Sequence, residues 1–87
     1  MNKAIWKFVL NNAGATRIKF LAPTIIKYLR VDRQGDNLCL WAEVDVGSIK
    51  TIQYLIIRAT GEVFETDDIH IGTFFDGPFV WHMYREE

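Results

Sequence analysis

LCLWAEVDV, residues 38–46, alternates strictly between two kinds of side chain. Leu, Ala and Val occupy every second position from Leu38 to Val46, while Cys39, Trp41 and two acidic residues occupy the positions between them. Successive side chains of a β-strand point to opposite faces, so this period of two predicts a strand with one buried face. The chain is therefore expected to contain a sheet that packs one face on a core.

Turn signals divide the rest of the chain at short, even intervals, which is typical of an all-β sandwich or barrel. They are clusters of Gly, Asn, Asp and Pro between runs rich in apolar residues. We predict a small antiparallel sandwich or partly open barrel of about seven strands, folded as a single domain over residues 1–87. The expected strands cover residues 4–10, 16–21, 24–33, 38–46, 51–59, 69–75 and 79–85.

The first two of these runs are predicted to form a hairpin. Residues 4–10 and 16–21 both have period two, and the turn signal Asn11-Asn12-Ala13-Gly14 lies between them. In the first run Trp6 and Phe8 share one face, so both are expected in the core.

Residues 24–33 allow two interpretations. Ile25, Tyr28 and Leu29 cluster at helical spacing, which leaves a helix open. The β-branched content and the short length favour a strand. Strict alternation in that strand would place Tyr28 and Arg30 on the same face.

Two further segments carry expectations about burial. Residues 51–59 are apolar almost throughout, which predicts a central strand covered on both faces. Residues 65–68 are acidic, and we expect them to form a solvated loop.

Length and composition favour self-association. The chain has 87 residues, of which 49% are hydrophobic and 14% aromatic. A domain of this size buries only about 60% of the surface that its unfolded chain exposes. Some of the apolar surface is therefore expected to remain as a contact patch, and we predict a homo-oligomer.

The sequence also predicts a cytoplasmic location. Cys39 is the single cysteine, so no intrachain disulfide can form, as is usual in a reducing compartment. Lys7 interrupts the short apolar stretch near the N-terminus, and no apolar run approaches the length of a membrane span. We therefore expect a soluble protein and no membrane partner.

Charge is distributed unevenly along the chain. The formal net charge is −1, which argues against a long nucleic acid as partner. Residues 1–35 contain seven Lys and Arg against one Asp, whereas residues 36–87 contain three against ten Asp and Glu. Such a split can steer an anion to one region or pair protomers head to tail. Equally, the charges of the two halves can cancel across a sheet.

No recognisable catalytic or metal centre is present, so we predict no enzyme and no cofactor. Ser48 is the only serine and lies in no nucleophile motif. Cys39 lies in an alternating strand, which indicates a structural cysteine. His70 and His82 are the only histidines, and they lack the ligand spacing of a metal site.

Aromatic and basic residues interleaved on strands provide the most specific functional signal. Aromatic rings stack on bases, and the Arg guanidinium binds phosphate oxygens in bidentate fashion. Trp41 stands on the polar face of its strand, where a Trp is either an interface anchor or a stacking platform. The predicted ligand-binding residues are Trp41, His82, Tyr84, Tyr28, Arg30 and Arg58.

Two motifs carry a family resemblance. They are CLWAEVD at residues 39–45, and IGT at residues 71–73 followed by FVWHMY at residues 79–84. They resemble the signatures CLWA-VD and IGT…FVWHVF of a family of small bacteriophage proteins catalogued as a domain of unknown function. The similarity extends over nearly the whole chain in length and motif order.

The resemblance implies a role in phage counter-defence. Small phage proteins of this kind include sponges that sequester the cyclic nucleotides made by bacterial immune systems such as CBASS. The resemblance thus implies a protein of the host bacterial cytoplasm that binds a cyclic di- or trinucleotide without hydrolysing it. The alternative is a structural or protein-inhibitor module that docks a host protein through exposed aromatics and edge strands.

Overall fold

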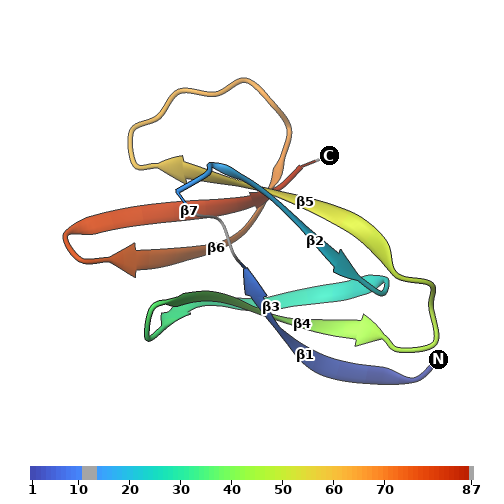
Figure 1. Ribbon diagram of the computed structural model, residues 1–87. Helices are drawn as coiled ribbons and strands as arrows, with labels where there is room; N and C mark the ends of the chain where they lie inside the picture. The colour runs from blue at the N-terminus through green and yellow to red at the C-terminus, as the bar shows by residue number, and fades with distance from the viewer. Residues whose placement is uncertain (11–13, 87) are drawn as a thin grey trace.

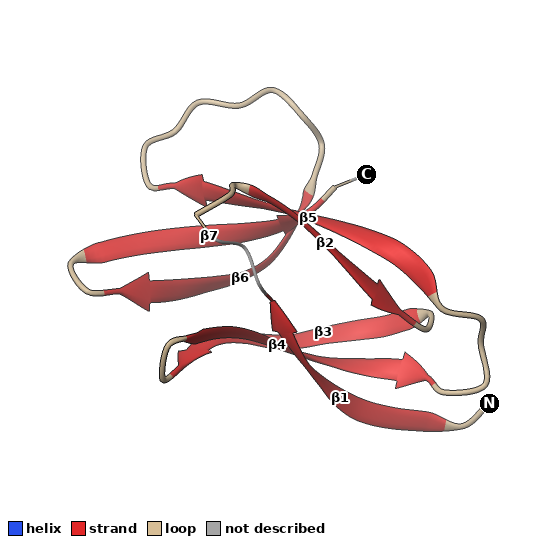
Figure 2. Cartoon of the chain, in the orientation of Figure 1, coloured by secondary structure: helices blue, strands red, loops and turns tan. Residues whose placement is uncertain are grey.

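The computed structural model describes residues 1–10 and 14–86, and within them every regular element is a strand (Figure 2). The predicted all-β class is confirmed, as is the number of strands. The two antiparallel sheets are not closed into a barrel. The strands are β1 (Lys3–Leu10), β2 (Arg17–Ala22), β3 (Ile25–Gln34), β4 (Asn37–Asp45), β5 (Thr51–Ala59), β6 (Ile69–Asp76) and β7 (Phe79–Arg85).

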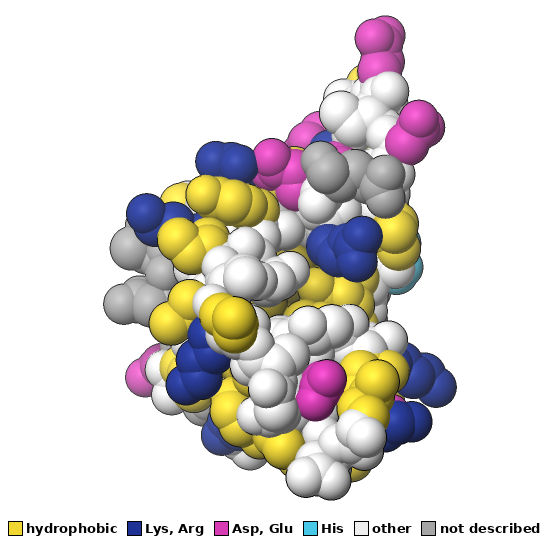
Figure 3. Space-filling view, turned by 90° about the vertical axis from the view of Figure 1, so that its right-hand side faces the viewer, with side chains coloured by type: hydrophobic (Ala, Val, Ile, Leu, Met, Phe, Trp, Pro, Cys, Tyr) yellow, Lys and Arg dark blue, Asp and Glu magenta, His cyan; other side chains and the backbone are white. Residues whose placement is uncertain are grey.

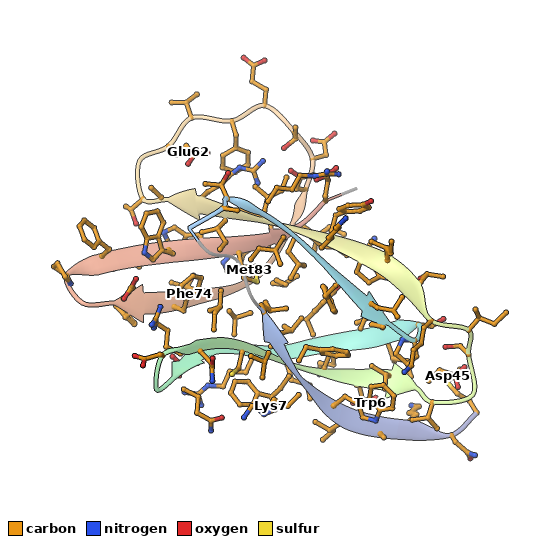
Figure 4. All side chains as sticks on the ribbon, viewed as in Figure 1. Trp6, Lys7, Asp45, Glu62, Phe74 and Met83 are labelled. Atoms are coloured by element: carbon orange, nitrogen blue, oxygen red, sulfur yellow. The ribbon has the colours of Figure 1, made fainter. Side chains whose placement is uncertain are left out.

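The two sheets face one another across a common core (Figure 1). One has three strands in the order β1-β4-β3, and the other has four in the order β2-β5-β7-β6. Leu40 of the first sheet and Leu55 and Met83 of the second are completely buried. Phe74 and Met83 lie in the space between the sheets (Figure 4). This arrangement leaves each sheet with one outer face.

The central strand β4 has the predicted alternation. Leu38, Leu40, Ala42 and Val44 are buried on the inner face. Trp41 lies on the opposite face and is half-buried.

The predicted hairpin of the first two strands is wrong. β1 pairs with β4, and β2 pairs with β5 in the other sheet. The ring centroids of Phe8 and Phe20 are 5.0 Å apart, at an edge-to-face angle. The apolar rows of the two strands therefore bury each other across the interior. Of the turn predicted at residues 11–14, only Gly14 lies within the described residues.

Residues 25–34 form a strand, as predicted, but the predicted faces are wrong. Two irregularities in the pairing of β3 with β4 each insert one residue, between Ile25 and Lys27 and between Tyr28 and Arg30. An inserted residue changes the face on which the following side chains lie. Tyr28 consequently joins the inner face, whereas Arg30 lies opposite Trp41 on the outer face.

Strand β5 lies between β2 and β7, as expected of a central strand. Both faces of β5 are buried only near its C-terminal end. The prediction that the whole strand is covered on both faces is therefore wrong. Ile52 is 54% exposed on the outer face, while Arg58 is buried. Side chains of the loop at residues 60–68 contact Arg58 on that face.

The edge strands β3 and β6 bring the two sheets into close contact. A Cβ atom built on Gly72 of β6 would lie 3.0 Å from a methyl carbon of Val31 in β3. Such a distance is shorter than ordinary packing contacts, so glycine permits this approach. In residues 1–10 and 14–86, no helix has the length and apolar character needed to cross a membrane.

Candidate functional site

The six residues that the sequence singled out lie in three separate places. Trp41 and Arg30 are neighbours on the outer face of the three-stranded sheet. Arg58, His82 and Tyr84 project from the outer face of the four-stranded sheet. Tyr28 packs against the core between the sheets.

A row of three side chains crosses the outer face of the three-stranded sheet. Trp41 on the central strand β4 is the register partner of Lys7 on β1 and of Arg30 on β3. The Nζ atom of Lys7 lies 6.0 Å from the centre of the Trp41 ring system, within the range of cation–π attraction. The indole therefore has one cation on each side. We call these three residues the tryptophan row.

A shallow groove of about 380 Å³ runs along the β3 side of the tryptophan row. The Lys7 ammonium donates a hydrogen bond to the side-chain carbonyl of Gln34, which is one of the residues that line the groove. Lys7 is on the lower surface of the molecule in Figure 4, away from the interior. The groove is lined by Arg30, Asp32, Arg33, Gln34 and Trp41.

Arg30 remains accessible despite a carboxylate partner. Its Nη2 atom lies 2.5 Å from Oδ2 of Asp32, yet its side chain is 68% exposed. The hydrogen bond from Arg30 and another from the backbone N–H of Arg33 hold the pKa of Asp32 below its usual range. Asp32 is therefore ionised at neutral pH and binds one edge of the guanidinium, while solvent reaches the rest.

Arg58 on the other sheet is buried beneath a loop. Its side chain is 6% exposed and that of Asp68 is 4% exposed, with Nη2 and Oδ2 2.8 Å apart. The same Nη2 atom donates to Oγ1 of Thr66 at 3.0 Å. The prediction that residues 65–68 form a solvated loop is therefore wrong for Asp68, because this carboxylate neutralises a buried cation.

Two aromatic rings also lie against the guanidinium of Arg58. The guanidinium carbon lies 3.9 Å from the ring centroid of Phe64 and 4.9 Å from that of Tyr84. Phe64 and Tyr84 also contact each other edge to face at 5.2 Å. The loop thus covers Arg58 with an aromatic ring and a carboxylate, and an external anion has no direct access to it in this arrangement.

The two histidines lie in a hydrogen-bonded chain beside this cluster. One ring nitrogen of His82 is 2.8 Å from Oγ1 of Thr60, and the other is 3.1 Å from Oγ1 of Thr73. Thr73 also lies 3.1 Å from Nε2 of His70. Both ring nitrogens of His82 therefore already have partners within the protein.

Tyr28 does not contribute to either outer face. Its hydroxyl group is buried and has no hydrogen-bond partner among the described residues. Burial raises the pKa of Tyr28, with a smaller opposing contribution from Arg85.

Cys39 and His82 lie on different sheets, so they do not form a thiol–imidazole pair. Cys39 is buried in the three-stranded sheet, and His82 lies on the outer face of the other sheet. Over residues 1–10 and 14–86, no group of three or more His, Cys, Asp or Glu side chains is placed to hold a metal ion.

Sequence reasoning missed Lys7 in the tryptophan row, Arg33 at the groove and Asp68 at the buried arginine. Lys7 stands on the polar face of its strand, and that pattern was visible in the sequence. Its position beside Trp41 depends on the pairing of β1 with β4, which the predicted hairpin did not suggest. Asp68 gave no signal, since an acidic loop is usually solvated.

The fold and its outer faces define a small antiparallel β-sandwich that presents aromatic and basic residues from a sheet. The chain belongs to the family named domain of unknown function DUF7352, whose model matches residues 1–87. Searches with the chain find no match among curated proteins or among solved structures.

Proposed function

We propose that this protein is a non-catalytic binding module for a small anionic nucleotide, with the ligand held at the tryptophan row. The tryptophan row supports this proposal most directly, since it places an aromatic ring between two cations on an open sheet face. Stacking on an indole accepts any base, while Lys and Arg attract phosphate. Arg33 adds a third cation at the groove.

In this proposal the physiological ligand is a cyclic di- or trinucleotide that signals in bacterial immunity. The protein binds it without turnover in the cytoplasm of an infected bacterium and so acts in phage counter-defence. The sequence motifs resemble those of small phage proteins, which supports this assignment. A compact ligand with two or three phosphates also suits an aromatic ring that has a cation on each side.

A homo-oligomer forms part of the same proposal. The groove is shallow, whereas small-molecule sites bury about 70 to 90% of their ligand. A second copy laid over the tryptophan row would enclose the nucleotide. Ile5 and Val9, exposed on β1 beside the row, would supply apolar contact for that copy.

Native mass spectrometry of the purified protein with a panel of cyclic di- and trinucleotides tests the proposal. We expect one nucleotide to be retained unhydrolysed, at a fixed ratio to an oligomer. Trp41→Ala and Arg30→Gln should each abolish retention. If both variants retain ligand and oligomer as the parent does, the site is elsewhere.

Two variants that each remove one positive charge distinguish a direct contact with the nucleotide from a general effect of net charge on binding. Lys7→Gln removes a cation of the tryptophan row, while Lys19→Gln removes an exposed cation from the outer face of β2. We expect Lys7→Gln alone to weaken nucleotide binding, by about tenfold for one charge-assisted contact. An oligomer that ignores the whole panel would favour the alternative function, docking of a host protein.

A further inference from the structure

A second recess opens between the two sheets and shares only Arg33 with the groove beside the tryptophan row. It has a volume of about 250 Å³ and lies at the end of the sandwich where the β3–β4 and β6–β7 turns are found (Figure 1, left). Its floor consists of Leu38, Ile57 and Phe74, which are buried members of the core. Trp81 forms one wall. The recess therefore reaches into the apolar interior.

The mouth of this recess is polar. Arg33 at the end of β3 and Asp76 at the end of β6 line it together with residues 14–16. The Nη1 atom of Arg33 is 3.6 Å from Oδ2 of Asp76, which is longer than a hydrogen bond. An exposed ion pair with this geometry contributes little stability, so a competing anion can replace the carboxylate of Asp76.

We infer that this inter-sheet recess binds a small monocarboxylic acid with an aromatic or branched apolar body. The side chains of the floor have no hydrogen-bonding groups, so a polar group buried there would be costly. The apolar body of the ligand therefore occupies the floor. The carboxylate lies at the mouth against the fork of Arg33, which suits bidentate binding.

The volume sets the size of this ligand. A cavity of about 150 Å³ lined by Leu, Ile and Phe is sufficient to bind benzene. The recess is larger and has an open mouth. It therefore accommodates one aromatic ring with a short chain that brings a carboxylate to the surface. A dinucleotide is too large for it, so this site does not depend on the proposed function.

The three tryptophans allow the two sites to be observed separately. Trp81 lies at the recess and Trp41 belongs to the tryptophan row. Trp6 lies elsewhere in the molecule, with its ring centroid 6.2 Å from that of Phe8. Each indole N–H gives its own signal in a two-dimensional ¹⁵N–¹H spectrum. Single Trp→Phe variants assign the three signals.

The experiment is a titration of the full chain with 3-phenylpropionate, its amide and acetate. We expect 3-phenylpropionate to shift the Trp81 signal and to leave the Trp41 and Trp6 signals in place. The amide should bind about tenfold more weakly because it lacks the charge that pairs with Arg33. Acetate has no apolar body and should leave the Trp81 signal unchanged.

Arg33→Gln should remove the preference for acid over amide, whereas Arg30→Gln should preserve it. A Trp81 signal that stays fixed at millimolar 3-phenylpropionate would overturn the inference. Equal affinity for acid and amide in the parent protein would refute the role of Arg33, even if Arg33→Gln failed to fold. Cyclic nucleotides that shift Trp41 and not Trp81 would support the proposed function independently.

Discussion

Arg30 and Arg58 lie on the outer faces of the two sheets, and each has an aspartate within hydrogen-bonding distance. Arg30 pairs with Asp32, two residues away on the same strand, and remains 68% exposed. Arg58 pairs with Asp68, ten residues away on a loop, and is 6% exposed. The same two residue types thus form an accessible surface pair on one sheet and a buried pair on the other.

The difference shows that burial, not residue type, decides what a charged pair can do. A surface pair contributes little to stability and leaves its cation free to meet a ligand. A buried pair is costly to break, because the charge left behind has lost its solvation. The carboxylates of the covering loop gather at one end of the molecule (Figure 3, top), and Glu62 projects from this loop (Figure 4). We therefore expect Arg58 to be structural and Arg30 to be available.

The largest expected effect is that of Asp68→Ala. This change leaves the buried Arg58 without its main partner and should lower the free energy of unfolding by about 3 to 5 kcal/mol. Urea denaturation at neutral pH measures it. Asp67→Ala, which alters the exposed neighbour, is the matched control and should change stability by less than about 0.5 kcal/mol.

A double variant sharpens this test. Replacing both partners, as in Arg58→Met with Asp68→Leu, removes both buried charges and should recover most of the lost stability. If Asp68→Ala is no more destabilising than Asp67→Ala, the two faces do not differ as described.

The contact that holds the two sheets together at one corner gives the next largest effect. Gly72→Ala would push a methyl group against Val31 and should cost about 1 to 3 kcal/mol of stability. Gly47→Ala is the control, because its new Cβ would meet only the side chain of Asp45 at an ordinary 3.6 Å. Thermal unfolding followed by circular dichroism compares the two, and equal midpoints would argue against the close approach.

Tyr28→Phe should have a smaller effect of opposite sign. It removes a buried hydroxyl group without a hydrogen-bond partner, and we expect stability at neutral pH to rise by about 1 kcal/mol. Burial raises the pKa of Tyr28 in the folded state, so the folded protein holds this proton more tightly than the unfolded chain does. The parent should therefore lose stability as pH rises above about 10, the ordinary tyrosine value.

Urea midpoints from pH 8 to pH 11 test this dependence on Tyr28. The loss should be smaller in Tyr28→Phe than in the parent. Identical pH profiles for the two proteins would contradict the burial of Tyr28.

The smallest expected effect on stability is that of Arg30→Gln. Since the Arg30 side chain is mostly solvated, its loss should leave the urea midpoint unchanged while nucleotide retention disappears. Arg58→Gln provides the comparison and should unfold at clearly lower urea. Equal destabilisation by both variants would remove the distinction between the two faces.

The sequence predicted the class of fold because alternation is a local property. Residues 38–46 carry their period of two whatever strand lies beside them, and β4 has the buried face that they predict. The partners of a strand are set by contacts between distant segments, so the turn signal after β1 wrongly suggested a pairing with β2. Both strands have a half-apolar pattern that suits either sheet.

The candidate site was predictable only as separate residues. Trp41 was noticeable as an aromatic residue on a polar face, and Arg30 as a basic residue interleaved with aromatics on the strand before it. Trp41 and Arg30 are adjacent because of the irregularity between Tyr28 and Arg30. This irregularity places Tyr28 on the inner face and Arg30 on the outer face. The other irregularity, between Ile25 and Lys27, leaves the inward residues Ile25 and Tyr28 three apart, and their spacing is part of the pattern that left a helix open for this strand.

The sequence by itself determined an all-β chain with amphipathic strands, because side-chain alternation and turn chemistry act over a few residues. Tertiary structure decided which sheet each strand joins, which face of β3 is buried, and which arginine is accessible. Those outcomes depend on the burial of whole faces and on loops that fold back over them. The desolvation of Arg58 is one such outcome, since it arises only when residues 60–68 close over β5.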